Sequence, residues 1–266
     1  MRARPTSTTL PFVYGGGARG RPFGSRASKA HARGPEPLQA SSNVRGMLHV
    51  CRGELKKYSV ILASQSPRRK ELLQSLGLEY ETVVSNFAED LDKTKYSNNA
   101  ADYAADTALH KVEDVSNIIL EREKGNGDGR YLIIGADTVV DLEGEVMEKP
   151  ATEEEAFGML SKLSGNTHTV HTGVAVCLLE SGGRSKEFTK CAESTSVTFS
   201  VLPEEVIRAY IASGEPMDKA GSYGIQGSGG SMVSGIKGCY FNVMGLPLNR
   251  LSKLLIEVLG KTSEGA

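Results

Sequence analysis

Two adjacent arginines follow a proline in the stretch ASQSPRRKELL, residues 63–73. An apolar run of strand length ends here, and a helix is predicted to begin, with Ser66 as its N-cap and Pro67 in its first turn. The N-terminus of a helix carries a partial positive charge, which suits an anion and opposes Arg68 and Arg69. Two interpretations stay open from this stretch alone. The arginines are solvated surface residues, or they bind an oxyanion such as a triphosphate through paired hydrogen bonds.

A lysine and an aspartate interrupt apolar patterns further along the chain. Lys111 falls on the helical stripe of Ala104, Ala108 and Val115, where it either extends to the helix edge or points into a cleft and meets an anion. Asp137 lies between two apolar strand segments in IIGADTVV and should be at least partly buried. A buried carboxylate needs a cation, hydrogen bonds or a raised pKa, which makes Asp137 a candidate Mg²⁺ ligand or general base. The alternative is an aspartate that caps a local turn.

Three further features carry weaker signals. Lys149 precedes a proline at the end of a predicted hairpin. Its side chain either returns toward Asp137 or lies on the surface. The segment 218–238 is dense in glycine, with Gln226 near its middle, and such a segment lets the backbone approach a ligand closely, although surface loops are also rich in glycine. His168 and His171 are three residues apart in a predicted strand, so they point to opposite faces. We expect both at the surface or the sheet edge, not as a metal pair.

Together these residues favour hydrolysis of a polyphosphate over acyl transfer or redox chemistry. The sequence contains no GxxxxGK[ST] loop, no nucleophile elbow, no zinc-protease motif and no strand–GxGxxG–helix context. Its four cysteines are scattered without a C-x-x-C pair, which is typical of reduced thiols. No apolar run approaches 18 residues, so we expect no membrane span.

Charge is distributed unevenly over the 266 residues, of which 39% are hydrophobic. Residues 1–55 hold nine basic and two acidic residues, which leaves 22 basic and 30 acidic residues in the rest. An acidic body argues against a general nucleic-acid-binding surface, which needs clustered positive charge. Residues 1–55 also lack apolar periodicity, so we expect them to be disordered, with a single folded domain at 56–262.

The basic segment leaves the compartment open. Its arginine- and serine-rich, acid-poor start is similar to an organellar transit peptide, which would direct the protein to a plastid or mitochondrion. Alternatively it is a dispensable extension with Met47 as a downstream start, and the protein is then expected in the cytoplasm.

Helices and strands alternate along the remaining sequence, which predicts the α/β class with a mixed, twisted sheet and flanking helices. Strands are expected at 59–64, 80–85, 131–148 (a pair that turns at Glu143–Gly144), 167–180 and 193–202. Helices are expected at 66–77, 100–122, 152–165 (with a capping box of Thr152 and Glu155), 203–214 and 247–260.

A series of motifs, in order over about residues 58–260, resembles the Maf family of nucleoside triphosphate pyrophosphatases. The motifs are LASQSPRRKELL, Glu89 after NFA, GADTVV, EKP, LSG, YIASGEPMDKAGSYGIQG and GLPL. The resemblance implies two lobes around a cleft, as in the inosine triphosphatase fold. It implies hydrolysis of a noncanonical or pyrimidine nucleoside triphosphate to the monophosphate and pyrophosphate, with a divalent metal cation (Mg²⁺ or Mn²⁺). It also implies the nucleotide as partner and often a homodimer, and the charge and apolar pattern described above add the expectation of no nucleic acid and no membrane.

The resemblance also implies roles for individual residues. It places the proton acceptor at Asp137, with Lys149 and Lys111 beside it in catalysis, and metal contacts at Glu89 and Asp137. It places substrate contacts at Ser64, Arg68, Arg69, Thr138 and Gln226. Whether Asp137 acts as base, metal ligand or both stays open.

Three motifs bear on the choice of substrate. SPRR, ADT and IQG are similar to members that hydrolyse dTTP and UTP, whereas members that hydrolyse 7-methyl-GTP carry SPWR, SDQ and EG. The chain contains no tryptophan and has Arg68, Thr138 and Gln226 at the three positions. A glutamine amide can both donate to and accept from a pyrimidine edge. The alternatives are 7-methyl-GTP hydrolysis and a nonenzymatic nucleotide-binding regulator of cell division, as the family's septum-formation name suggests.

Overall fold

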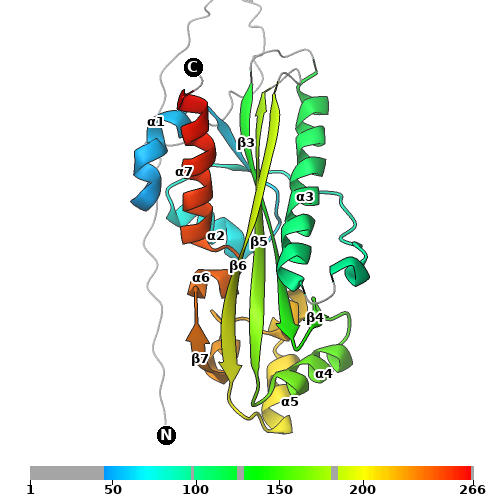
Figure 1. The fold of residues 1–266 in the computed structure, drawn as a ribbon. Helices are drawn as coiled ribbons and strands as arrows, with labels where there is room; N and C mark the ends of the chain where they lie inside the picture. Colours follow the sequence, from blue (N-terminus) through cyan, green and yellow to red (C-terminus); the bar gives the residue numbers. More distant parts are fainter. Residues whose placement is uncertain (1–44, 97–98, 125–128, 181–184, 265–266) are drawn as a thin grey trace, which may run out of the picture. The chain divides into compact units, whose positions relative to one another are not determined.

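The computed structural model describes residues 45–96, 99–124, 129–180 and 185–264 (Figure 1). Within them the chain forms a seven-stranded sheet in the order β2–β1–β3–β5–β6–β7, with β4 paired to β3. The strands are β1 (Ser59–Leu62), β2 (Glu81–Thr82), β3 (Arg130–Leu142), β4 (Glu145–Met147), β5 (Thr167–Glu180), β6 (Lys186–Phe199) and β7 (Val233–Lys237). β1 runs parallel to β2 and β3, and the other pairings are antiparallel. The predicted α/β class with a mixed sheet is confirmed.

Helices follow the predicted pattern closely. The α-helices are α1 (Arg52–Leu55), α2 (Pro67–Ser75), α3 (Ala100–Arg122), α4 (Glu153–Leu163), α5 (Glu204–Ala212), α6 (Tyr240–Met244) and α7 (Leu248–Glu264). The 3₁₀ segments are η1 (Gly46–Cys51), η2 (Lys93–Tyr96), η4 (Glu215–Asp218), η5 (Ala220–Ser222) and η6 (Ser228–Met232). All five predicted helices are present, and Ser66 caps α2 by accepting a hydrogen bond from the Arg69 N–H group.

Several strands differ from the prediction: β1 ends at Leu62 instead of residue 64, and β7 was not predicted. β2 is shorter than the expected 80–85, and β6 begins at Lys186, well before the expected residue 193. The early part of β6 escaped detection because Lys186, Glu187 and Lys190 are exposed and break any apolar alternation. Its backbone nevertheless pairs with β5 along the whole strand, from the Thr167–Thr198 pair to the Leu179–Lys186 pair. The early part of β6 is therefore extended because it pairs with β5, and not because of a pattern in its own sequence.

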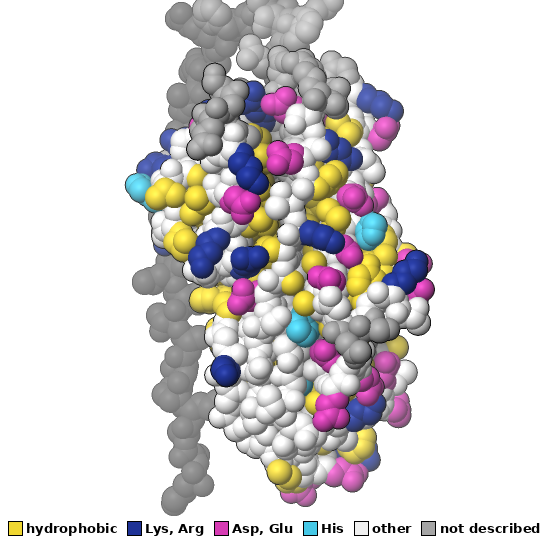
Figure 2. All heavy atoms as spheres, viewed as in Figure 1, with side chains coloured by type: hydrophobic (Ala, Val, Ile, Leu, Met, Phe, Trp, Pro, Cys, Tyr) yellow, Lys and Arg dark blue, Asp and Glu magenta, His cyan; other side chains and the backbone are white. Residues whose placement is uncertain are grey.

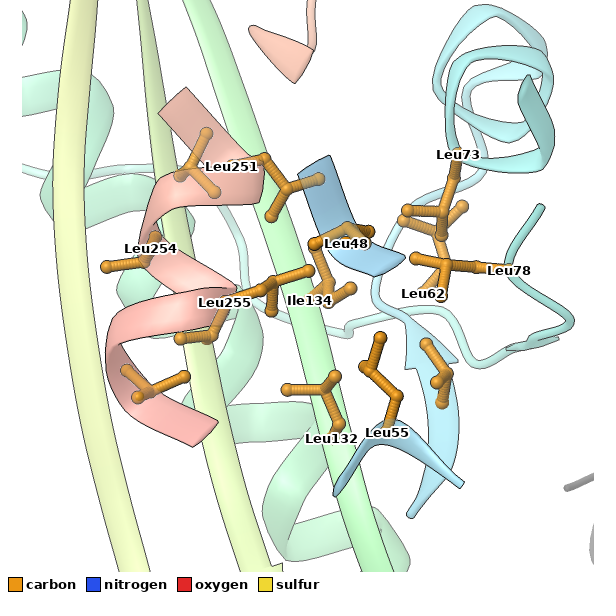
Figure 3. Packing of buried hydrophobic residues seen from close by; sticks show 14 of the residues in the cluster. Leu48, Leu55, Leu62, Leu73, Leu78, Leu132, Ile134, Leu251, Leu254 and Leu255 are labelled. Atoms are coloured by element: carbon orange, nitrogen blue, oxygen red, sulfur yellow. The ribbon is translucent and has the colours of Figure 1, made fainter. Parts of the chain in front are cut away.

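Alternate residues of the central strands pack against helices on opposite faces of the sheet. Leu132 and Ile134 of β3 belong to the same buried cluster as the leucines of α7, whereas Ile133 belongs to the cluster of α3. This follows from the period of two in a strand. Figure 1 shows α7 and α3 on either side of β3 and β5, and Figure 3 shows the α7 leucines against Leu132 and Ile134.

Helix α3 approaches the sheet closely at two glycines. A Cβ atom at Gly173 would lie 2.2 Å from the backbone carbonyl carbon of Ala104, and one at Gly135 would lie 2.5 Å from Cγ2 of Val112. Gly173 is the cross-strand partner of Asp137. The absence of a side chain at Gly173 therefore lets α3 lie against the part of the sheet that carries Asp137.

The fold begins earlier than the predicted boundary at residue 56. Leu48 of η1 and Leu55 of α1 are fully buried, and both pack in the cluster that contains Leu255 of α7 (Figure 3). The expected disorder therefore does not hold for residues 46–55. Only a few apolar side chains in this short segment are buried, and the surface that buries them comes from the far end of the chain. Residues 1–44, which include most of the expected extension, lie outside the described residues.

Basic and acidic side chains are interspersed on the face shown in Figure 2. Surfaces that bind nucleic acids gather positive charge into patches or stripes, and the coloured residues on this face form no such patch. Among the helices of the described residues, none combines the length and the apolar character needed to cross a bilayer.

Candidate active site

A cavity of about 440 Å³ opens beside β3, at the point where β1 ends. β1 pairs with β3 as far as Leu62 and Ile134, and β3 then continues with Asp137 and Thr138, which line the cavity. Ligands of open α/β sheets commonly bind outside the carboxyl ends of such strands. All nine predicted site residues line this cavity: Ser64, Arg68, Arg69, Glu89, Lys111, Asp137, Thr138, Lys149 and Gln226. The structure thus brings them together, and their chemical roles stay predictions.

Arg69 is held by the protein through all three nitrogens of its guanidinium. Nε donates to the carbonyl of Gly245 at 2.9 Å, Nη1 to Oγ of Ser64 at 3.3 Å and Nη2 to Oγ1 of Thr138 at 3.0 Å. Burial lowers the pKa of Arg69, and Asp137 acts in the opposite direction. An arginine nevertheless stays charged at neutral pH. Arg69 therefore contributes a positive charge in a fixed position, with two of its five N–H groups left for a ligand.

Arg68 points to a different part of the cavity. Its Nη1 donates to Oδ2 of Asp218 at 3.2 Å, and the Arg68 side chain is 26% exposed against 61% for Asp218. An ion pair this exposed to water is weak. The two adjacent arginines therefore have different contacts. Arg69 is held in place by hydrogen bonds in the wall of the cavity, whereas Arg68 links α2 to η4 by a contact that an anionic ligand can replace.

Lys111 points into the cavity and joins two carboxylates. Its Nζ lies 2.7 Å from Oδ1 of Asp137 and 2.9 Å from Oε2 of Glu89. The side chains of Lys111 and Asp137 are only 9% and 12% exposed, whereas that of Glu89 is 43% exposed. The cleft interpretation of Lys111 is therefore correct, and the predicted burial of Asp137 is confirmed. A buried lysine with two carboxylate partners satisfies the rule that buried charges are paired.

Glu89 occupies an unusual backbone conformation. Its φ of +54° lies in the left-handed region, which a residue other than glycine seldom adopts. Burial opposes its ionisation, but Lys111, Lys149 and Arg69 outweigh this and hold the pKa of Glu89 below its usual value. Backbone strain of this kind persists where the surroundings determine it and often occurs at functional sites.

The hydroxyl of Thr138 belongs to a directed chain of hydrogen bonds. Thr172 Oγ1 donates to the carbonyl of the buried Asn242 at 2.9 Å, so its single hydrogen is used there. The 3.0 Å contact between the two threonine hydroxyls must then have Thr138 as donor. Because Arg69 donates to Thr138, this hydroxyl has only acceptor capacity left for a ligand.

The cavity lining also includes residues that were not selected from the sequence, among them Asp218, Lys219 and Tyr223. Lys219 Nζ donates to Oδ1 of Asp218 at 2.6 Å and to the carbonyl of Glu215 at 2.5 Å. All three residues lie in the run DKAGSYG, at the start of the glycine-rich segment. The charged pair directly before the glycines was the signal that could have identified them.

His168 is buried, contrary to the expectation of a surface or edge position. Its side chain packs edge-on against Phe199 and Tyr223, and its Nε2 lies 2.8 Å from the Tyr223 hydroxyl. Burial lowers the pKa of His168 to about 4, so the ring is neutral at neutral pH. The expectation failed because the face of β5 that carries His168 is covered here, by Phe199 and Tyr223. The prediction of opposite faces is confirmed, since His171 bonds to Ser194 instead.

The charged lining of the cavity has an excess of positive charge. Its basic members are Arg68, Arg69, Lys111, Lys149 and Lys219, and its acidic members are Glu89, Asp137 and Asp218. Five cations against three carboxylates leave an excess of two positive charges in a chain whose overall charge is −1. Such a cavity is complementary to a polyanion.

Two carboxylates were predicted to contact a divalent metal. Both Asp137 and Glu89 lie on the cavity wall and bond to Lys111. In the described part of the chain, no group of three or more His, Cys, Asp or Glu side chains is arranged to hold a metal by itself. Mg²⁺ is commonly bound by one or two carboxylates together with substrate phosphates. The donor set therefore fits a cation that enters with a nucleotide.

Comparisons with known proteins agree with this arrangement. A family model described as Maf-like protein matches residues 59–258. A Clostridium perfringens protein named "dTTP/UTP pyrophosphatase" is 50% identical over 196 residues, which cover 74% of this chain and 95% of that protein. A protein of the same name from Acetivibrio thermocellus is 43% identical over 198 residues, covering 74% of this chain and 93% of that protein.

A human protein extends the similarity to a longer chain. It is named "Probable bifunctional dTTP/UTP pyrophosphatase/methyltransferase protein" and is 42% identical over 208 residues. The match covers 77% of this chain but 33% of the human protein. In each of these three comparisons, therefore, about three quarters of this chain is matched.

Proposed function

The chain belongs to the Maf family, and we propose that it hydrolyses dTTP, UTP and modified pyrimidine nucleoside triphosphates to the monophosphate and pyrophosphate. The similar clostridial proteins are named dTTP/UTP pyrophosphatase, and the chain covers nearly their whole length. Hydrolysis of this kind would keep noncanonical nucleotides from being incorporated into nucleic acids.

One observation carries the proposal: a buried carboxylate lies in a cavity whose charged lining is mainly cationic. Asp137 is 8% exposed and is paired with Lys111, while Arg68, Arg69 and Lys149 line the same space. The cations offer the charge that a triphosphate needs, and the carboxylate offers a group to orient or deprotonate water. A hydrolase for phosphate anhydrides requires both.

In the proposed reaction, a water oxygen forms a new bond to phosphorus and the P–O bond between the α- and β-phosphates breaks. Lys111 already occupies Oδ1 of Asp137, so Oδ2 is the oxygen that orients the water and receives its proton. Pyrophosphate leaves with the electron pair of the broken bond. Lys111, Lys149 and the two arginines offset the negative charge that grows on it.

A divalent cation, Mg²⁺ or Mn²⁺, would be held by Asp137 and Glu89 and would act as a Lewis acid on the phosphate oxygens. Both carboxylates now share Lys111, so their negative charge is partly offset before the nucleotide arrives. Metal titration of Asp137→Asn and Glu89→Gln separates the two roles of Asp137. If Asp137 acts only as a base, the Asp137→Asn variant should bind the metal with the same affinity as the wild-type protein.

The pyrimidine base is proposed to contact Arg68, Thr138 and Gln226. Thymine and uracil each present an N3–H donor between two carbonyl oxygens. Thr138 retains only acceptor capacity, which is complementary to that N3–H group. The amide of Gln226 offers both a donor and an acceptor to the remaining positions. The proposed preference for pyrimidine over 7-methylguanine substrates rests on the resemblance of SPRR, ADT and IQG to members that hydrolyse dTTP and UTP.

The test is a substrate panel with purified protein. Wild-type protein and Asp137→Asn are incubated with dTTP, UTP, CTP or 7-methyl-GTP and Mg²⁺, and the monophosphate and pyrophosphate are measured. We expect equal amounts of both products from dTTP and UTP, with far slower release by Asp137→Asn. Preference for 7-methyl-GTP would replace the pyrimidine assignment. Binding of dTTP without any release of pyrophosphate would contradict the proposed enzyme activity and favour the alternative of a nonenzymatic nucleotide-binding regulator.

A further inference from the structure

Gln226 is carried by a short turn within the glycine-rich segment. The N–H group of Gly227 donates to the carbonyl of Gly224 at 3.3 Å, so Ile225 and Gln226 occupy the two central positions of a four-residue turn. Both central side chains line the cavity. We call residues 224–227 the Gln226 turn. Gln226 is exposed, and the place from which its side chain reaches the cavity depends on how firmly the two ends of this turn hold its backbone.

Glu215 holds the segment that follows the turn. Its Oε2 accepts hydrogen bonds from the N–H group of Ser228 at 3.0 Å and from the Ser228 hydroxyl at 2.6 Å. Its Oε1 accepts from the N–H group of Gly229 at 3.3 Å. Partial burial opposes ionisation, but the hydrogen bonds from Ser228 and Gly229 outweigh it and hold the pKa of Glu215 below its usual value. A charged acceptor with several donors is a strong anchor.

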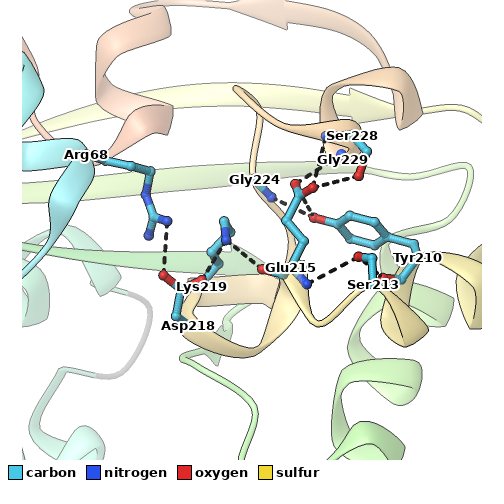
Figure 4. A network of polar contacts seen from close by, with 9 residues as sticks. All are labelled: Arg68, Tyr210, Ser213, Glu215, Asp218, Lys219, Gly224, Ser228 and Gly229. Atoms are coloured by element: carbon cyan, nitrogen blue, oxygen red, sulfur yellow. Dashed lines mark hydrogen bonds and ion pairs between the residues drawn. The ribbon is translucent and has the colours of Figure 1, made fainter. Parts of the chain in front are cut away.

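Tyr210 holds the beginning of the turn and is coupled to the same carboxylate. Its hydroxyl accepts from the N–H group of Gly224 at 3.0 Å and donates to Oε1 of Glu215 at 3.0 Å. Figure 4 shows the Tyr210 ring and the Glu215 carboxylate side by side, with bonds from both to the glycine-rich segment. One pair of side chains thus fixes both ends of the Gln226 turn, and we refer to this pair as the clamp.

The glycines of this segment make room for the clamp. A Cβ atom at Gly227 would lie 2.2 Å from Oε1 of Glu215, and one at Gly229 would lie 2.6 Å from the hydroxyl oxygen of Tyr210. The N–H groups of Ser228 and Gly229 are therefore directed at a carboxylate of the protein itself. The glycine at position 227 therefore leaves space for the Glu215 carboxylate, an anion of the protein itself and not a ligand.

The clamp also connects to the arginine on the other side of the cavity. Lys219 donates to the backbone carbonyl of Glu215 and to Asp218, and Asp218 accepts from Arg68 (Figure 4). Neither Tyr210 nor Glu215 lines the cavity, whereas Arg68 and Gln226 do. The clamp therefore acts on the ligand only through the residues it positions.

We propose that Glu215 and Tyr210 are positioning residues for base selection, which hold Gln226 at the height and orientation that distinguish a uracil-type edge from a cytosine edge. The proposal rests on the proposed function, because it takes the base to lie against Gln226. Cytosine carries an amino donor where uracil carries the O4 acceptor. A glutamine free to rotate would satisfy either base, whereas a fixed amide satisfies one.

The test compares three ligands: the α,β-methylene analogues of UTP and CTP, which cannot be hydrolysed between these phosphates, and tripolyphosphate, which has no base. Glu215→Gln keeps the size of the side chain but places an NH₂ donor among groups that are all donors. Tyr210→Phe removes only the hydroxyl. Glu205→Gln, an exposed glutamate on α5, is the matched control. Dissociation constants are measured with Mg²⁺, together with the melting temperature of each variant.

We expect Glu215→Gln and Tyr210→Phe each to reduce the UTP-over-CTP preference by about tenfold, the effect of one misdirected hydrogen bond. Tripolyphosphate should bind within about twofold of wild type in both variants, since its partners are outside the clamp. The double variant should lose no more preference than the stronger single variant, because both residues hold one turn. Glu205→Gln should match wild type.

Two results would overturn the proposal. One is an unchanged UTP-over-CTP preference in both folded variants. The other is an equal loss of all three ligands, which would indicate general damage to the fold. Because the two nucleotide analogues are not hydrolysed, the measured UTP-over-CTP preference does not depend on turnover. A wild-type protein that binds the UTP analogue selectively but releases no pyrophosphate from UTP would contradict the proposed function and leave the clamp supported.

Discussion

The ammonium of Lys111 lies 2.7 Å from Oδ1 of Asp137, and both side chains are almost completely removed from solvent. The two residues come from different elements, the middle of α3 and the middle of β3. Their contact depends on the close approach of α3 to the sheet at Gly135 and Gly173. The chemistry of the cavity therefore rests on a packing contact between a helix and two glycines.

Replacing Asp137 by asparagine should lower kcat on dTTP at least about 100-fold, in line with the loss of a general base. Asparagine keeps the shape of the side chain and an oxygen for Lys111, so the fold should persist. The measurement is pyrophosphate release under saturating nucleotide, with the melting temperature as control. Near-normal turnover in the purified variant would remove Asp137 from this role.

Replacing Lys111 by methionine should destabilise the protein by about 2–4 kcal/mol, because Asp137 is left as a buried charge without its cation. The double variant Lys111→Met, Asp137→Asn removes both charges and should regain much of that loss. The measurement is a double-mutant cycle, in which urea denaturation gives the free energy of unfolding of the wild type, the two variants and Asp137→Asn. Equal destabilisation of the single and double variants would show that packing, not charge, is the cause.

Replacing Gly173 by alanine should destabilise the protein by about 3 kcal/mol or more, because the new Cβ would meet the backbone of Ala104. The shift of α3 should also move Lys111 away from Asp137 and lower activity. Gly158 in α4 has no atom near an added Cβ and is the matched control. Gly158→Ala should be neutral or stabilising by up to about 1 kcal/mol. Similar free energies of unfolding for the two variants would contradict the packing argument.

Replacing Arg68 by tryptophan should shift preference away from pyrimidine triphosphates, because the cavity side chain that bonds to Asp218 of η4 changes from a cation to an aromatic ring. The measurement is the ratio of kcat/KM for dTTP and 7-methyl-GTP. Asp218→Asn weakens the ion pair but keeps the arginine, so it should retain the wild-type preference. An unchanged substrate profile in Arg68→Trp would exclude Arg68 from base selection.

The buried His168 should make the protein less stable as the pH falls from about 6.5 to about 4. Its pKa is depressed in the fold, so the unfolded chain takes up a proton in this range and the folded chain does not. Between these pH values stability should decrease by up to about 3 kcal/mol from this group. His168→Gln should show a flatter profile over that range in urea denaturation. Identical pH profiles for the variant and wild type would refute the assignment.

Much of the fold could be predicted from local pattern. Ser66 and Pro67 predicted the start of α2, and the apolar stripe at 100–122 predicted α3, because capping and periodicity are properties of neighbouring residues. The early part of β6 and the segment 46–55 could not be predicted in this way. Their positions depend on β5 and α7, which lie far away in sequence.

The site shows the same division. Local pattern was enough to select Arg68, Arg69, Lys111 and Asp137, because arginine at a helix start, lysine in an apolar stripe and aspartate within a strand are each costly without a partner. Weaker signals pointed to Lys149 and Gln226, and the resemblance to the Maf family added Ser64, Glu89 and Thr138, so that nine residues were selected that meet in one cavity. Only the tertiary structure decided how each one is held there. Arg69 is anchored, Arg68 is paired with Asp218, and Thr138 keeps only acceptor capacity.

The glycine-rich segment makes the difference clearest. Its sequence indicates backbone that something approaches closely, but not what approaches. The structure places the carboxylate of Glu215 and the hydroxyl of Tyr210 against it, and Gln226 on the turn between them. A hydrogen bond between residues that are distant along the chain has no local pattern, so only the folded arrangement specifies it.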